Sequence, residues 1–211
     1  MTGPETPATA PPSTWPIGWG TTSYGIDYAF LPFPRRVPAP WKAEAITVRF
    51  RAGDQDHTPD LRETALFVLD EIRAISTLRF TVATDFGRDE PVAAPAPQEI
   101  RVACAAPGER VDGLGRGTLG IGGVQLASRD GRASGGFAML ADPARIAAAD
   151  STMLAVVRHE IGHAVGLGHA KRRGLVMNSV GSDEPWGVGD RMGLALIAEY
   201  SSGQECTCRM E

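Results

Sequence analysis

The chain has 211 residues and a formal net charge of −4, with 21 basic and 25 acidic side chains interspersed along it. Its length fits one ordinary domain, and 43% hydrophobic residues is normal for a soluble globular core. The mixed charges argue against nucleic-acid and membrane partners, and no window approaches the run of about 18 apolar residues that a membrane span needs. We therefore expect a soluble protein.

The first 40 residues hold nine of the 16 prolines, at positions 4, 7, 11, 12, 16, 32, 34, 38 and 40. This density excludes helix and sheet interior, so we expect residues 1–40 to form an extended arm whose first dozen residues are disordered. The start has no basic residues followed by an apolar run, so it does not resemble a secretory signal. We expect the aromatic part of the arm to pack on the body of the protein: Trp15, Trp19, Tyr24, Tyr28, Phe30 and Phe33.

From residue 41 the hydrophobic pattern predicts a folded domain that extends to residue 202, followed by a tail at 203–211. Residues 45–50 alternate as in a strand, and residues 61–77 have apolar side chains three and four apart, as in a long helix with Asp60 as N-cap. Residues 78–85 and 99–106 alternate again and predict two further strands.

The second half of this domain begins with a glycine-rich stretch. It leads to a weak strand at about 122–128 and another at 136–142, which we expect to pair. Residues 143–166 are predicted to be helical, with Asp142 as N-cap and a restart near Asp150, and a last helix over 189–200 has Asp190 as its cap. This order predicts an α+β fold.

Three of the four histidines lie within the segment HEIGHAVGLGH, residues 159–169. On a helix, residues four apart share a face, so His159 and His163 point at one place, as two zinc ligands must. Glu160 is adjacent to the first ligand and suits a general base. A straight helix cannot deliver His169 to the same place, so we expect the chain to bend at Gly166, where glycine permits a positive φ.

Three protein ligands leave the fourth tetrahedral position open, which is the arrangement of a catalytic zinc. The pattern HExxHxxGxxH resembles the metzincin clan of zinc metallopeptidases, with every fixed position filled. Met177 resembles the methionine turn of that clan, and its interval of eight residues after His169 is typical of matrixins. The resemblance extends topologically over residues 41–202.

The resemblance implies a zincin catalytic domain with a twisted, mostly parallel five-stranded sheet, a long backing helix, an active-site helix and a C-terminal helix. It implies a zinc endopeptidase that hydrolyses extended protein or peptide substrates through a zinc-bound water activated by Glu160. It further implies a monomer outside the cell. Substrate would pair with the 122–128 strand, and the loop 178–189 would line the primed-side pocket.

Some matrixin features are missing from the sequence. The histidines of a second, structural zinc are absent, since only His57 remains, and we expect His57 to be a solvated loop residue. The N-terminal arm has no cysteine switch, and Ser179 stands where astacins and serralysins have a tyrosine ligand. These departures predict a minimal, microbial type with one zinc. The missing switch and the missing secretory signal also motivate the alternative of a zinc-holding module that binds peptides without cleaving them.

Two smaller features leave alternatives open. Asp112 and Asp130 could bind calcium, as matrixins do, but Asp-Gly is first of all a turn signal. The odd number of cysteines leaves the redox compartment undecided. Cys104 alternates with apolar residues and is expected to be a buried thiol, whereas Cys206 and Cys208 fit a strained bridge, a weak metal clip or a free tail.

Overall fold

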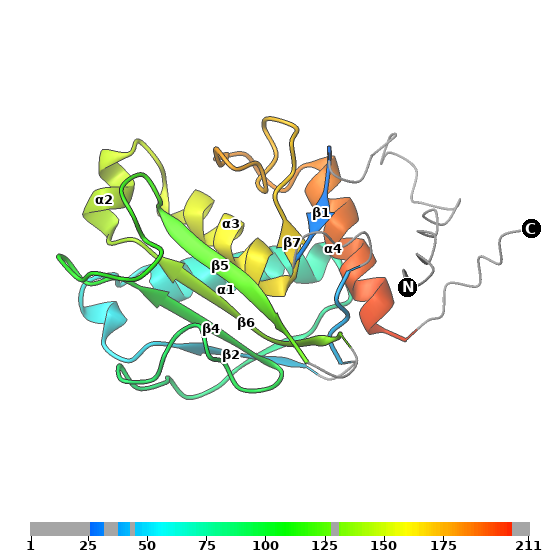
Figure 1. The fold of residues 1–211 in the computed structure, drawn as a ribbon, viewed down its shortest axis with the longest axis horizontal. Coiled ribbons are helices and arrows are strands. Elements are labelled where there is room, and N and C mark those ends of the chain that lie inside the picture. The colour runs from blue at the N-terminus through cyan, green and yellow to red at the C-terminus, as the bar shows by residue number, and fades with distance from the viewer. Residues whose placement is uncertain (1–25, 32–37, 43–44, 128–130, 204–211) are drawn as a thin grey trace, which may run out of the picture.

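A computed structural model describes residues 26–31, 38–42, 45–127 and 131–203. Its centre is a five-stranded sheet, and the helices α1 (Leu61–Ile75) and α3 (Met153–Val165) pack against each other beside it (Figure 1). The expected α+β layout is therefore present. None of the helices in the described ranges is long and apolar enough to cross a membrane.

The main sheet has the order β3-β2-β4-β6-β5. Its strands are β2 (Ile46–Phe50), β3 (Phe80–Val82), β4 (Glu99–Cys104), β5 (Gly120–Leu126) and β6 (Ala133–Leu140). The pairs β2–β3, β2–β4 and β4–β6 are parallel, whereas β5 runs antiparallel to β6. The sheet is therefore mostly parallel, as expected, and β5 is an edge strand with one side open to a further strand.

All five strands differ at one or both ends from the sequence prediction. β2 begins at Ile46 instead of residue 45, and β4 ends at Cys104 instead of residue 106. β3 is shorter than 78–85 because the backbone oxygens of Thr84 and Asp85 accept hydrogen bonds from the Arg49 guanidinium. β5 begins at Gly120, two residues earlier than predicted. The prediction missed this start because the first residues of the strand include glycines, which give no apolar alternation. β6 begins at Ala133 and ends at Leu140, since Asp142 belongs to the next helix.

The predicted helix over 143–166 is two helices, α2 (Pro143–Ala148) and α3. Asp142 caps α2 as expected, by accepting from the backbone N–H of Arg145. Asp150 has a φ of 54°, which no helix can contain, so the restart is a true break. Thr152 caps α3 by accepting from the backbone N–H of Ala155.

The last helix, α4 (Val188–Ser201), has Gly187 as its N-cap, so the assignment of Asp190 as cap was wrong. Asp190 lies one turn inside the helix, and its carboxylate turns back to accept from the N–H of Gly187. The Asp60 prediction is right in position, since Asp60 precedes α1, but its side chain forms no cap hydrogen bond.

A second, two-stranded sheet brings the early chain onto the body. β1 (Ala29–Phe30) pairs antiparallel with β7 (Leu167–Gly168), directly after α3. Tyr28 and Phe30 are buried, as expected for the aromatic part of the arm. Trp15, Trp19, Tyr24 and Phe33 lie outside the described residues, as do Asp130, Cys206 and Cys208.

Candidate metal centre

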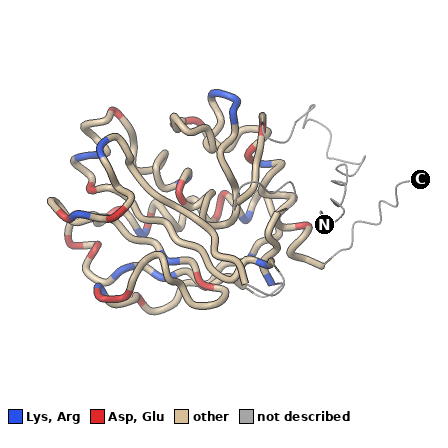
Figure 2. The backbone as a smooth tube through the Cα atoms, in the orientation of Figure 1, with Lys and Arg blue, Asp and Glu red and all other residues tan. Residues whose placement is uncertain are grey.

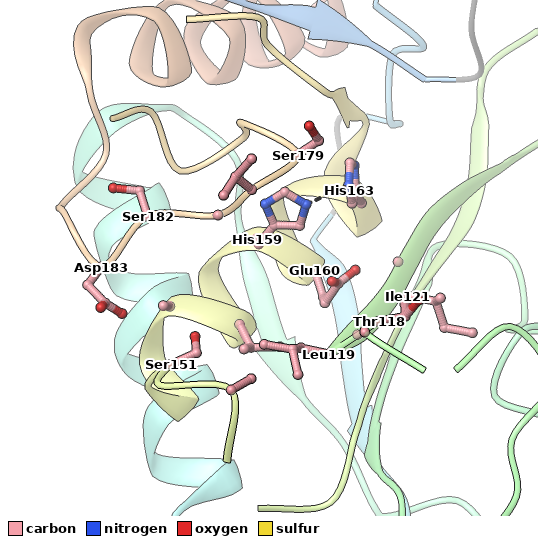
Figure 3. Close-up of a pocket in the computed structure, with 18 of the residues that line it drawn as sticks. Thr118, Leu119, Ile121, Ser151, His159, Glu160, His163, Ser179, Ser182 and Asp183 are labelled. Carbon is pink, nitrogen blue, oxygen red and sulfur yellow. Dashed lines mark hydrogen bonds between the residues drawn. The ribbon is translucent and has the colours of Figure 1, made fainter. Parts of the chain in front are cut away.

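The helix α3 carries His159 and His163, and its two ends explain why they are held firmly. Thr152 caps the start of the helix. Gly166 ends it with a φ of 120°, a backbone conformation that residues with a side chain rarely adopt. The bend predicted at Gly166 is therefore present. His159 and His163 stand one turn apart on the helix face that lines a pocket (Figure 3).

His169 reaches the same place from the segment after the bend. Its Nε2 atom lies 3.2 Å from Nε2 of His159 and 3.1 Å from Nε2 of His163. The Nε2 atoms of His159 and His163 are 3.1 Å apart. Three ligands bonded to one tetrahedral zinc at about 2.0–2.1 Å lie about 3.3–3.4 Å from one another. The three nitrogens therefore have nearly the spacing that one metal ion requires.

The opposite ring nitrogens show which atoms would face the ion. His159 Nδ1 donates to the backbone oxygen of Val176 at 2.7 Å, and His163 Nδ1 donates to that of Leu167 at 2.8 Å. Because a carbonyl oxygen only accepts, Nδ1 must carry the proton in both rings, and each Nε2 offers a lone pair. Lone pairs that converge in this way repel one another unless a cation lies between them.

The histidine rings are neutral in this environment. Burial lowers the pKa of His163 to about 3, with a further contribution from the neighbouring histidines. Burial also lowers the pKa of His159 and of His169 below the ordinary value. A neutral imidazole is the form that binds metal, so the described residues fit a zinc ion.

Glu160 is next to this centre and has an unusual environment. Its side chain is buried, with 5% of the residue exposed, and its Oε2 atom has no hydrogen-bond partner. Burial raises the pKa of its carboxyl group to about 8. A cation among the three histidines would favour the ionised form and act against this shift. A carboxyl group held in this way is available for proton transfer.

Two glycines of β5 make room for Glu160. A β-carbon at Gly120 would lie 2.5 Å from Cγ of Glu160, and one at Gly122 would lie 2.5 Å from its backbone oxygen. Only residues without a side chain fit here, so the edge strand runs directly beside the general-base candidate. Sequence reasoning noted a glycine-rich stretch at this point but missed its purpose, because the contact is between segments far apart in the chain.

Met177 packs against the helix α3. It is 1% exposed, and a β-carbon at Gly162 would lie 2.4 Å from its sulfur. The carboxylate of Asp190 accepts from the N–H groups of Val176 and Met177, at 2.9 and 3.2 Å. Asp190 thus holds the turn that provides both the methionine and the carbonyl partner of His159.

The loop after Met177 is fixed at two points. Trp186 donates its indole N–H to Glu71 of α1, and the same carboxylate accepts two hydrogen bonds from Arg158 of α3, at 2.9 and 2.7 Å. Nearer the pocket, the Thr152 hydroxyl donates to Asp183 at 2.9 Å. No sequence pattern indicates this role of Glu71, because its partners come from two other segments.

A pocket of about 550 Å³ contains the three histidines and Glu160. Its walls come from β5 and the segment before it, from α3 and from residues 179–183, part of the loop expected to line a specificity pocket. Figure 3 shows Thr118 and Leu119 on one side of the helix and Ser182 and Asp183 on the other. The predicted zinc ligands and general base thus share one accessible cavity.

The remaining predictions concern residues outside this pocket. Cys104 is fully buried and free, as expected, and donates to the backbone oxygen of Ala141. His57 is half-buried rather than solvated, with Nε2 3.4 Å from the Cys104 oxygen. Asp112 is exposed and does not belong to the histidine cluster, which in the described ranges is the one group of three or more His, Cys, Asp or Glu side chains close enough together to hold a metal ion.

The sequence was also compared with known proteins. No family model matches the chain, and a search of curated proteins finds no significant match. What is known of the fold and the site thus comes from the structure alone. It shows an α+β fold with a three-histidine cluster that can hold a metal ion, and this arrangement is compatible in general terms with a zincin.

Proposed function

We propose that the chain is a zinc-dependent endopeptidase of the metzincin clan, matrixin-like in type. The observation that carries the proposal is the unpartnered Oε2 atom of Glu160 beside three converging Nε2 atoms. Burying a carboxyl group without a partner costs free energy, so its retention points to a chemical role. The full HExxHxxGxxH pattern, with Met177 beneath the helix, supports the same assignment.

His159, His163 and His169 would hold the zinc. Zinc bound there would act as a Lewis acid that makes a water molecule acidic near neutral pH and polarises a peptide carbonyl. Glu160 would take a proton from the water that attacks this carbonyl and return a proton to the nitrogen that leaves. One peptide bond and one water thereby become a carboxylic acid and an amine.

The edge strand supports an extended protein or peptide as substrate. β5 lies beside Glu160 and, within the described sheet, pairs only with β6, so its other side can receive a substrate backbone by strand addition. The pocket beside the helix would take a substrate side chain. By the same resemblance we propose a monomer that acts outside the cell.

The decisive experiment replaces Glu160 with alanine. Because Glu160 is not a ligand, E160A should bind one zinc per chain like the wild-type protein. Its rate of casein cleavage should fall by about 10²-fold or more, the contribution typical of general acid–base catalysis. The exposed Glu184, in the loop next to the pocket, is the matched control: E184A should keep both properties.

Cleavage by E160A at the wild-type rate would rule out the proposed role of Glu160. If the zinc-loaded wild-type protein binds peptides but yields no products by mass spectrometry, the peptide-binding alternative is correct instead. These two results are distinguishable because zinc content and peptide binding are measured separately from turnover.

A further inference from the structure

The pocket has two chemically different ends. Near the end of α3 it contains the metal-binding histidines, and near the start of α3 it is lined by Asp150, Ser151 and Asp183. Figure 3 shows Ser151 and Asp183 beside the first turn of the helix, away from His163. The wall between them includes the apolar side chains of Ala155 and Val156.

One of the two carboxylates at this end is held in place by a hydrogen bond, and the other stands at a break in the backbone. Asp183 accepts from the Thr152 hydroxyl at 2.9 Å, and the same hydroxyl caps α3. Asp150 has the left-handed φ of 54° at the break between α2 and α3. Both residues are exposed and line the pocket.

Among the described residues that line the pocket, none is lysine or arginine. Figure 2 shows basic and acidic residues mixed along the described backbone, so this lack of positive side chains is local to the pocket. The start of α3 contributes a partial charge of about +0.5 from its free N–H groups. Two full negative charges exceed it, and this end of the pocket stays negative.

A second observation links this pocket to a ligand. The buried Glu160 lines the same pocket, and its unpartnered Oε2 atom marks where a reacting group would lie. A substrate residue next to the reacting bond would therefore extend its side chain along Ala155 and Val156 toward the two carboxylates. A side chain with an apolar stem and a positively charged end would match the apolar wall first and the carboxylates beyond it.

We propose that the pocket selects a lysine or arginine side chain next to the scissile bond, with Asp150 and Asp183 as the specificity-determining residues. This inference rests on the proposed endopeptidase function. Pairing between exposed charges contributes little for each pair, so the two carboxylates together should give about a fivefold preference over a neutral side chain of similar length.

The test uses zinc-loaded full-length protein and peptides that differ only in the residue next to the bond that is cut. We expect kcat/KM to fall in the order Lys, Gln, Glu. In the double variant D150N/D183N the three peptides should be cut at similar rates, because Asn keeps the shape and tolerates the left-handed backbone at position 150. E184Q is the matched control and should keep the order.

A second readout is independent of turnover. Zinc-loaded E160Q should bind the Lys peptide more tightly than the Glu peptide, and about 0.5 M salt should reduce this difference because exposed charges are screened. An unchanged order in D150N/D183N, or an order led by Glu, would overturn the proposed specificity while the peptidase stands. If wild-type protein cuts none of the peptides, nor casein, the proposed function fails as well.

Discussion

Gly122 of β5 lies so close to Glu160 of α3 that a β-carbon there would stand 2.5 Å from the Glu160 backbone oxygen and 2.9 Å from its Oε2 atom. The backbone oxygen cannot move aside without displacing the helix that carries two of the metal-binding histidines. The edge strand can therefore lie this close to the general-base candidate only because Gly122 has no side chain.

We therefore expect Gly122→Ala to destabilise the protein by about 1–3 kcal/mol, the usual cost of overpacking, and to weaken metal binding. Urea unfolding and zinc titration would measure the two effects. Gly115→Ala is the control, since a β-carbon at Gly115 meets no atom within 4 Å. If G122A unfolds at the wild-type urea concentration, the close fit between β5 and α3 is incorrect.

Glu71 should be important for stability although it lies outside the pocket. Its carboxylate accepts from both Arg158 and Trp186, and the Arg158 side chain is only 6% exposed. Glu71→Ala leaves this guanidinium without its partner, so we expect a loss of about 3 kcal/mol in the free energy of unfolding.

Asp70→Asn provides the comparison for Glu71. Asp70 also pairs with an arginine of α1, Arg73, but its side chain is 67% exposed, so its removal should cost less than about 0.5 kcal/mol. Equal stability losses in the two variants would show that burial does not determine the strength of these pairs.

Asp190 should act on the metal through the turn beneath it. It accepts from the N–H groups of Val176 and Met177, and the oxygen of Val176 accepts from the ring of His159. In Asp190→Asn one acceptor becomes an NH₂ group that faces a backbone donor. We expect zinc affinity to fall by about 10- to 100-fold, as for other residues that orient metal ligands. Competition with a chelator would measure this change.

Asn178→Ala is the contrasting variant for Asp190. The Asn178 amide donates to the backbone oxygens of Ala170, Lys171 and Arg172, and none of these three hydrogen bonds involves His159. It should lower stability, but the His159–Val176 hydrogen bond should survive. Unchanged zinc affinity in D190N would refute the role of Asp190 in ligand orientation.

Cys104 predicts a specific dependence of stability on pH. Burial raises the pKa of its thiol from 9.0 to about 11. The thiol therefore ionises in the unfolded chain before it ionises in the folded one. Its contribution is complete below about pH 8, and it is lost as the pH rises from 9 to about 11.

Urea unfolding at pH 8 and pH 10 would measure this effect as a difference between the wild-type protein and Cys104→Ala, which removes only this ionising group. In a C206S/C208S variant, a thiol reagent at pH 8 should modify Cys104 only after unfolding. Rapid modification of the native protein would contradict the burial of the thiol.

The fold was predictable where the pattern was local. The long helix α1, the four longer strands and the break at Gly166 follow from apolar spacing and from one glycine. Boundaries failed where a tertiary contact decided them, as at Thr84, whose backbone oxygen bonds to Arg49. They also failed at Asp190, which lies inside α4 and accepts both from the N-cap residue Gly187 and from the turn at Val176.

The candidate site was predictable for a similar reason. His159, Glu160, His163 and His169 lie within eleven consecutive positions, so the helix and one bend are enough to bring them together. Gly122, Glu71 and Asp150 acquire their roles only from segments distant in the chain. Periodicity and spacing carry no information about such contacts.

The small sheet of β1 and β7 links the beginning of the chain to the third histidine. The N–H of Leu31 donates to the oxygen of Gly166, and the N–H of Arg172 donates to that of Ile26, so residues 26–31 flank both sides of His169 along the chain. If docking of residues 26–31 helps to hold His169 in place, binding of an ion at His169 and docking of this segment favour each other by the same free energy. Residues 26–31 would therefore support the metal site. If the chain is cut after residue 31 and this segment dissociates, the protein should release zinc.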